Sequence, residues 1–489
     1  MSSTTRFLVL TVAAIGFLFD TYELLMFPVT GAEAIAELLR VRPDSDEVRL
    51  WSGRMLWIAA LCGGVFGLLG GWLIDRLGRK TVMVASILIY SVSPVAAALS
   101  TELWMLIVFR CTTFIGVCVE AVAAVTWLAE LFADKRSREM AIGWTLAFAS
   151  VGGIAVTEVY NGIVEVLKND PTGLPRLPVP DGFNGHAAWR YTLLTGLVPG
   201  ALILVLMPFV PESRVWAERK RAGTLRRPSF GELFAPGLLR TTLVTTGLSA
   251  CAYAAAFGAL QLGPLVMVPG LPAIDEVKKE APARVKAAQE KVDAAQTGTP
   301  ERAAAEEELT RAKGMVSQAI KEKRGNIQRW QEIGGLTGRV ILAALLVFVP
   351  SRVLLKLFIL PGVVLFPLTY FRLIEGEYTA FAVAVFFCGL LTVGQFSFIS
   401  EYLPKVFPVH LRGTGGGFAT NFGGRMLGTM AATLNTELLA PLFEGDNPAK
   451  VATAAAVIGG TVYFVALVLS FWMPAPKADE PVPPRDLPR

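Results

Sequence analysis

The sequence predicts an all-α membrane protein with about twelve transmembrane helices. Hydrophobic residues make up 53% of the 489 residues and charged residues only 17%, whereas a soluble chain carries about a quarter charged residues. Twelve apolar runs are separated by short polar segments, and each is close to the roughly 20 residues that cross a bilayer. The runs lie at about 6–29, 53–74, 80–99, 103–129, 140–166, 189–210, 239–270, 332–350, 354–373, 377–400, 413–441 and 451–473.

Basic residues recur in alternate loops, which places those loops and both termini in the cytoplasm. The net charge of +5 then follows from topology and needs no nucleic-acid partner. The first run contains Asp20 and Glu23 and no small-residue cleavage site follows it, so we interpret it as a retained span and not as a signal peptide.

The runs form two six-helix halves. Run four ends in Trp127-Leu-Ala-Glu130 and run ten in Phe398-Ile-Ser-Glu401, and a basic residue follows each, as expected of parallel repeats. We therefore divide the chain into an N-terminal half (1–210), a cytoplasmic linker (211–238), a C-terminal half (239–473) and a Pro-rich cytoplasmic tail (474–489).

Residues 272–330 interrupt the second half with a polar, charge-balanced segment. Small apolar residues recur every three or four positions, which indicates a helical seam on each side of Gly298-Thr299-Pro300. We expect an antiparallel helical hairpin outside the membrane, on the outer face, between helices 7 and 8. It is either an inert insert or disordered loop, or a segment for protein docking or self-association. The seam residues are Val285, Ala288, Val292 and Ala295, then Leu309, Ala312, Val316 and Ala319.

Several charged residues lie inside the apolar runs. Such residues cost at least a few kcal/mol at bilayer depth, so they usually face a cavity and find partners. The acids are Asp20, Glu23, Glu120 and Glu158, and the bases are Arg110, Arg339 and Arg425.

Loop motifs resemble those of one transporter superfamily. The segment Gly71-Trp-Leu-Ile-Asp75-Arg76-Leu-Gly78-Arg79-Lys80 resembles the loop between helices 2 and 3 of the major facilitator superfamily. Pro211-Glu212-Ser213-Arg214 resembles a sugar-porter loop, and Glu401 with Arg412-Gly-Thr-Gly resembles a loop of sugar porters and metabolite–proton symporters. The resemblance covers nearly everything except 272–330 and implies transport by alternating access. Run seven lacks the paired glutamines that mark sugar porters, which counts against a hexose.

The same resemblance implies a proton-coupling site. In the proton-coupled branches an acid in span one faces an arginine near the top of span four, which correspond here to Asp20 and Arg110. Helix rise places them roughly 15 Å and 10 Å below the outer ends of their helices. Protonation of Asp20 would release Arg110; the alternative is a permanent ion pair. Glu23, one turn away, could share or replace the role of Asp20.

Substrate contacts are expected from both halves. The stretch from Arg110 through Gly116 to Glu120 resembles the metabolite–proton symporter branch, although Val117 to Val119 replace most of its glycines. Glu120 is then expected to bind the substrate or a proton. The alternative is that its side chain forms a hydrogen bond between two helices. Arg339 and Arg425 would bind a carboxylate, unless they reach a surface or pair with an acid such as Glu437. Further expected lining residues are Tyr22, Trp57, Gln261, Gln395 and Asn421.

Charges at the basic face suggest a cytoplasmic gate that would lock the halves together in one state. The alternative is topological, with the arginines simply retained inside. The expected gate residues are Asp75, Arg76, Arg79, Glu130, Arg138, Glu212, Arg214, Glu401 and Arg412.

The leading hypothesis is proton-coupled symport of a small organic acid, in a plasma membrane of bacterial inner-membrane type. Alternatives are a sugar or polyol porter, an uncoupled facilitator, or a non-transporting sensor that uses the 272–330 hairpin. Expected partners are the substrate, protons and the lipid bilayer. A metal site is not expected, because all five cysteines lie in apolar runs and both histidines in predicted loops. An enzyme and a cofactor are not expected, because the sequence shows no nucleophile–base set and no phosphate-binding loop.

Overall fold

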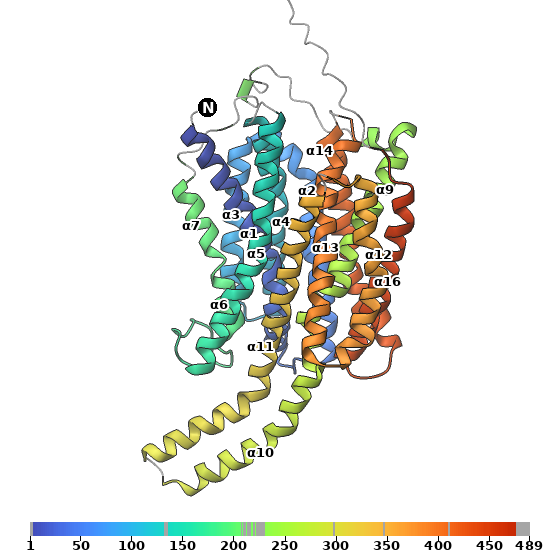
Figure 1. Cartoon of the computed structure of the whole chain (residues 1–489). Coiled ribbons are helices and arrows are strands. Elements are labelled where there is room, and N and C mark those ends of the chain that lie inside the picture. Colours follow the sequence, from blue (N-terminus) through green and yellow to red (C-terminus); the bar gives the residue numbers. More distant parts are fainter. Residues whose placement is uncertain are drawn as a thin grey trace, which may run out of the picture.

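The computed structural model is a bundle of long helices, with the N-terminal half on one side and the C-terminal half on the other (Figure 1). The structure describes residues 3–131, 135–206, 230–296, 299–345, 348–408 and 411–475, together with 208, 212, 217–218 and 221. No β-strand occurs among these residues. Most of the expected linker and all but two residues of the expected tail lie outside the described ranges.

Helices of the N-terminal half follow the predicted runs, except that run six forms two helices. Gly196 lies at this break, where an added Cβ would come within 2.7 Å of Oε1 of Glu23. The break therefore allows a buried carboxylate to approach the main chain. The helices are α1 (Ser3–Leu39), α2 (Asp46–Leu77), α3 (Arg79–Ala98), α4 (Leu103–Leu131), α5 (Lys135–Asn169), α6 (Ala188–Leu194) and α7 (Leu197–Leu206).

The C-terminal half contains π-helical stretches inside two of its membrane-length segments. The seventh segment runs from α9 (Pro236–Ala255) through π-helices η3 (Ala256–Leu260) and η4 (Gly263–Met267). The eleventh runs from α14 (Arg412–Gly417) through η8 (Phe418–Gly428), α15 (Ala431–Thr433) and η9 (Leu434–Leu439). π-Helical turns are frequent at functional sites. The other elements are the 3₁₀ turns η2 (Gly231–Phe234), η5 (Val268–Gly270), η6 (Leu373–Glu375) and η10 (Ala440–Leu442), and helices α12 (Ser351–Phe371), α13 (Tyr378–Val406) and α16 (Asn447–Phe471).

Eight helical segments of the described chain are long and apolar enough to cross a membrane. The remaining predicted runs correspond to α5, to α6 with α7, to the second part of α11 (Pro300–Leu345), and to the segment from α14 to η10.

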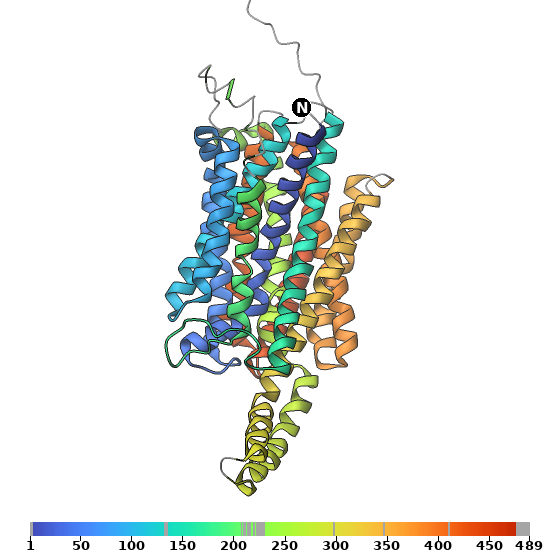
Figure 2. The same cartoon turned by 90° about the vertical axis from the view of Figure 1, so that its left-hand side faces the viewer.

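The insert is a helical hairpin, as predicted, and it projects from one end of the bundle (Figures 1 and 2). Its arms are α10 (Pro272–Ala294) and the first part of α11. Ala288, Val292, Ala305 and Leu309 form a buried seam between them. The second arm does not end at 330 but continues into the bundle as one 46-residue helix. The second arm of the hairpin and the membrane segment are therefore one continuous helix.

Candidate functional site

Two buried carboxyl groups of the N-terminal half lie side by side. Asp20 of α1 is 7% exposed and Glu120 of α4 is fully buried, and the two groups interact electrostatically. The Glu120 carboxyl group fits against α1 because residue 16 is a glycine. A Cβ added at Gly16 would lie 2.5 Å from Oε1 of Glu120. Arg425 of η8 lies within electrostatic range of Asp20. Among the described residues, Oδ1 of Asp20 and both Glu120 oxygens find no hydrogen-bond partner.

Arg110 does not pair with Asp20, contrary to the sequence-based expectation. Its guanidinium donates to the main-chain carbonyl oxygens of Glu23 and Leu24, both at 2.7 Å. The rings of Phe27 and Phe114 lie 5.4 Å and 4.8 Å from its central carbon. The carboxylate that interacts electrostatically with the Arg110 guanidinium is that of Glu23. Arg110 thus meets α1 one helical turn beyond Asp20.

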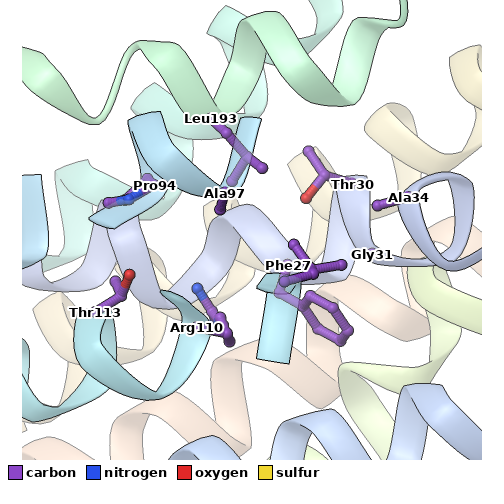
Figure 3. Close-up of a pocket in the computed structure, with 10 residues that line it drawn as sticks. Phe27, Thr30, Gly31, Ala34, Pro94, Ala97, Arg110, Thr113 and Leu193 are labelled. Atoms are coloured by element: carbon purple, nitrogen blue, oxygen red, sulfur yellow. The ribbon is translucent and has the colours of Figure 1, made fainter. Parts of the chain in front are cut away.

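A small cavity lies beside Arg110. Its volume is about 20 Å³, which is room for a single water molecule. Figure 3 shows Arg110 and Thr113 of α4 opposite Phe27 and Thr30 of α1, with Leu193 of α6 closing one side. The guanidinium therefore has a water-sized space next to it as well as its carbonyl partners.

Arg425 and Arg339 of the C-terminal half lie around one tyrosine that the sequence analysis did not select. Tyr253 of α9 interacts electrostatically with both guanidiniums. Arg425 also donates to Oδ1 of Asn421, one turn earlier in η8. Both arginines and Tyr253 are only partly buried, whereas Asn421 is 2% exposed. The three partly exposed groups form a cationic and aromatic surface inside the bundle.

Glycines in η8 make this arrangement possible. An added Cβ at Gly424 or Gly428 would lie 2.5 Å or 2.6 Å from atoms of Tyr253. Phe396 of α13 packs edge-on against the tyrosine ring, with centroids 4.9 Å apart. The glycines next to Arg425 in the sequence were a signal for close approach, but they did not indicate which residue approaches.

Glu332 is a second group that the sequence analysis missed. It is 6% exposed, and its Oε1 accepts hydrogen bonds from the amides of Gln328 (2.7 Å) and Gln331 (3.1 Å). Its Oε2 lies against α5, where a Cβ on Gly153 would come within 2.2 Å. Glu332 is the first residue of the predicted run 332–350, so the sequence gives no sign that it lies deep in the membrane. The uninterrupted α11 places it well inside the bundle.

The remaining predicted lining residues are mostly buried and make specific contacts. The Tyr22 hydroxyl bonds to the Thr195 hydroxyl at 2.6 Å, and Trp57 donates to the carbonyl oxygen of Met426 at 3.0 Å. Gln261 lies between the two π-helices of the seventh segment and is 5% exposed. Gln395 is 3% exposed.

Arg79, Glu212 and Glu401 are predicted gate residues whose contacts at this end of the bundle the structure describes. Arg79 is buried and donates to the carbonyl oxygen of Ile74 at 3.1 Å. Both Glu212 oxygens accept from the main-chain N–H of Lys80 at 3.1 Å, and Glu401 pairs with Lys405 of the same helix. Arg76 is exposed and Arg412 is half-buried. The side chains of Asp75, Glu130, Arg138 and Arg214 lie outside the described part of the chain.

Within the described part of the chain, several ion pairs that join the two halves lie at the opposite end of the bundle, on the hairpin side. Arg54 of α2 pairs with Glu437 of η9 at 2.5 Å, so Glu437 is not the partner of Arg425. Arg49 donates to Oδ1 of Asn447 at 2.9 Å and to the carbonyl oxygen of Thr436. Further pairs join α1 and α5 to α11: Glu33 with Lys321, Glu158 with Arg329, and Lys168 with Glu322.

Comparisons with known proteins agree with this architecture. The family described as "Sugar (and other) transporter" matches residues 12–226. Sialic acid transporter NanX of Escherichia coli is 26% identical over 209 residues, which is 42% of this chain and 44% of the relative. The arabinose-proton symporter of Bacillus subtilis is 26% identical over 157 residues, or 32% and 31% of the two chains. The chain thus aligns with less than half of the length of each of these relatives.

The solved structure of a D-xylose-proton symporter matches nearly the whole chain. It superposes with a TM-score of 0.63 over 96% of this chain and 98% of the other, at 16% sequence identity. Such a match establishes the arrangement of the helices in both halves. The apolar helices and the related carriers together identify a multi-pass membrane protein.

Proposed function

Because the chain has the fold of the major facilitator superfamily and resembles its sugar porters, we propose that it is a secondary active transporter. The cargo is a small organic acid that moves together with protons. The two halves rock about a central site, so that the site faces each side of the membrane in turn. The N-terminus and the C-terminus then lie in the cytoplasm of a bacterial cell, and the hairpin lies on the outer face.

The observation that carries this proposal is that Asp20, which lies beside Glu120 in the N-terminal half, is within electrostatic range of Arg425 of the C-terminal half. Two buried carboxylates side by side repel each other strongly, so a proton shared between them lowers the energy. One remaining negative charge is then balanced by Arg425. The cluster is neutral as long as it holds one proton.

Coupling between substrate and proton follows from this charge balance. A substrate carboxylate that binds Arg425 neutralises its positive charge, which had balanced the remaining negative charge of the Asp20–Glu120 pair. The pair then regains neutrality only by taking up a second proton. Substrate and proton binding therefore favour each other, which is the coupling that symport requires. In this scheme Glu23 and Arg110 act one turn further along as a second, separate charged contact between α1 and α4.

Recognition of an acid is supported by the cationic surface around Tyr253. Arg425 and Arg339 supply the two guanidiniums, and guanidinium groups hold carboxylates with paired hydrogen bonds. One of the relatives, NanX, is named for an acid. The size and shape of the cargo follow from residues around these arginines, among which Tyr253 and Phe396 offer an aromatic wall.

A sugar or polyol cargo is the second candidate. Its support is the family match over residues 12–226 and the relation to an arabinose-proton symporter. Gln261, Gln395 and Asn421 are buried neutral groups that suit hydroxyls. In this case Arg425 serves the acid pair alone and the cargo carries no charge.

Purified protein in liposomes tests the proposal. Sialic acid and arabinose serve as labelled probes, each with and without an inward proton gradient, and excess unlabelled organic acids and sugars serve as competitors. We expect gradient-driven accumulation that organic acids inhibit and neutral sugars do not. Inhibition by sugars alone would favour the second candidate. Wild-type protein that binds neither class in a thermal-shift screen and accumulates neither probe would contradict transport of both classes.

A further inference from the structure

We propose that the base of the hairpin is a charged clamp that holds the two halves together on the hairpin side and must release for the carrier to open there. The clamp consists of Lys321, Glu322 and Arg329 of α11 with Glu33, Lys168 and Glu158 of the N-terminal half. The inference rests on the alternating-access function proposed above and gives the insert a part in it.

Three ion pairs form the clamp, and each one joins α11 to the other half. Lys321 meets Glu33 of α1 at 2.8 Å. Arg329 holds Glu158 of α5 with two hydrogen bonds of 2.5 Å.

The third pair is Lys168 with Glu322, at 2.6 Å. Next to it, the amide of Gln318 donates to the carbonyl oxygen of Val164 at 3.3 Å. All of these partners on the N-terminal side belong to α1 or α5.

The residues of α11 that reach across share one face of the helix. Positions 318, 321, 322, 325 and 329 follow a spacing of three and four, which puts them on the same side. Gly325 lies in the middle of this face, where an added Cβ would come within 1.7 Å of Oδ1 of Asn161. The glycine lets α5 approach closely enough for the flanking ion pairs to form. The face continues inward to Glu332, which lies against Gly153.

The pairs differ in how well water screens them. The Lys321 and Glu33 side chains are 19% and 17% exposed, whereas those of Arg329 and Glu158 are 39% and 48% exposed. Exposed pairs contribute little one by one. A set that forms in one state and is broken in the other nevertheless biases the equilibrium between the two states by the sum of its members.

Continuity of α11 couples the hairpin to this clamp. The helix runs unbroken from Pro300 at the hairpin tip to Leu345 at the far end of the bundle, a length of roughly 70 Å at 1.5 Å per residue. The clamp lies where the hairpin arm enters the bundle. When the halves separate on this side, the arm moves with the C-terminal half and every clamp pair is pulled apart.

Distances between spin labels test the clamp without any substrate. Labels on cysteines that replace Asp181, in the exposed loop between α5 and α6, and Glu377, in the exposed loop between α12 and α13, report the separation of the halves on the hairpin side. The full chain is used in a background without its five native cysteines, reconstituted in liposomes. We expect Arg329→Glu, or Lys321→Glu, to increase the population with the longer distance at least about fivefold.

Restoration and a matched control make the result specific. The double reversal Glu158→Arg with Arg329→Glu rebuilds the pair and should return the distances to those of the parent protein. Arg311→Glu makes the same charge change on the same helix, but Arg311 pairs with Glu307 inside the hairpin arm and should leave the distances unchanged.

Distances that stay the same in both single reversals, in protein whose parent still accumulates substrate, would overturn the clamp and leave the transport proposal standing. An effect of Arg311→Glu as large as that of Arg329→Glu would also overturn it. Loss of uptake in the parent protein itself would count against the transport proposal and not against the ion pairs.

Discussion

The guanidinium of Arg110 donates to the main-chain carbonyl oxygen of Glu23 at 2.7 Å, so α4 is joined to α1 through the backbone and not through Asp20. A main-chain carbonyl carries no proton, so protonation cannot release this bond. Asp20 is left with Glu120 and Arg425 as its charged neighbours. The two acids of α1 thus have separate surroundings, which makes their roles separable by mutation.

Asp20→Asn should abolish accumulation driven by a proton gradient while substrate exchange persists. The amide keeps the size of the side chain but cannot take up or release the proton that balances Arg425. We expect accumulation to fall at least about tenfold, corresponding to about 1.4 kcal/mol of lost coupling. Glu23→Gln is the matched control on the same helix and should retain most of the accumulation. Full accumulation by Asp20→Asn liposomes, measured as the inside-to-outside ratio of labelled substrate, would contradict the proposed coupling site.

Arg425→Lys should weaken binding of the acid substrate without unfolding the protein. A lysine keeps the charge but loses the planar pair of donors, and bidentate recognition of a carboxylate is not restored. We expect the KM for uptake to rise about tenfold or more, with a smaller change in maximal rate. Arg302→Lys, in the hairpin, is a charge-conserving control outside the bundle. An unchanged KM for the acid would favour a neutral cargo.

The sequence was sufficient to predict the positions of the charges along the helices but not their partners. Helix rise placed Asp20 roughly 15 Å and Arg110 roughly 10 Å below the outer ends of their helices, and the actual contact lies one turn away at Glu23. Depth does not fix how a helix is rotated about its axis, and the rotation decides which side chain faces which. Tyr253 was missed for the same reason, because its partner Arg425 lies on η8, a π-helix whose wider turns change the direction in which every later residue points.

The hairpin could be predicted because its signal is local. Apolar residues at helical spacing predicted Ala288, Val292 and Leu309 as members of the seam, and the structure adds Ala305. The contacts of its base could not be predicted, because Glu33, Glu158 and Lys168 lie more than 150 residues away in the sequence. A gate of paired charges was expected at the cytoplasmic face. Among the described residues, ion pairs between the halves also lie at the other face, where the partners come from helices distant in the sequence. The cytoplasmic gate itself stays a prediction.

Gly424→Ala should disturb the arginine site by displacing Tyr253. An added methyl group would lie 2.5 Å from the tyrosine ring, and overpacking of this kind costs about 1–3 kcal/mol. We expect a lower Tm and weaker stabilisation by the acid substrate. Gly417→Ala changes a glycine of the same segment with nothing within 4 Å and should leave both measurements unchanged. A Gly424→Ala protein with the Tm and the ligand response of the parent would show that Tyr253 does not depend on this glycine.

Glu212→Gln should destabilise the start of α3 and thereby the loop that joins α2 and α3. Both oxygens of Glu212 accept from the main-chain N–H of Lys80, in the first turn of α3 (Arg79–Ala98). A carboxylate at a helix N-terminus is favoured by the helix dipole and satisfies an otherwise unpaired N–H. An amide keeps one acceptor but loses the charge, so we expect a loss of about 0.5–1 kcal/mol, measured as a lower Tm. Glu212→Asp shortens the side chain by one methylene group, so this variant should lose the contact and should be no more stable than Glu212→Gln. If Glu212→Gln matched the parent protein in Tm, the contact would be too weak to hold the segment after the sixth span against the start of α3.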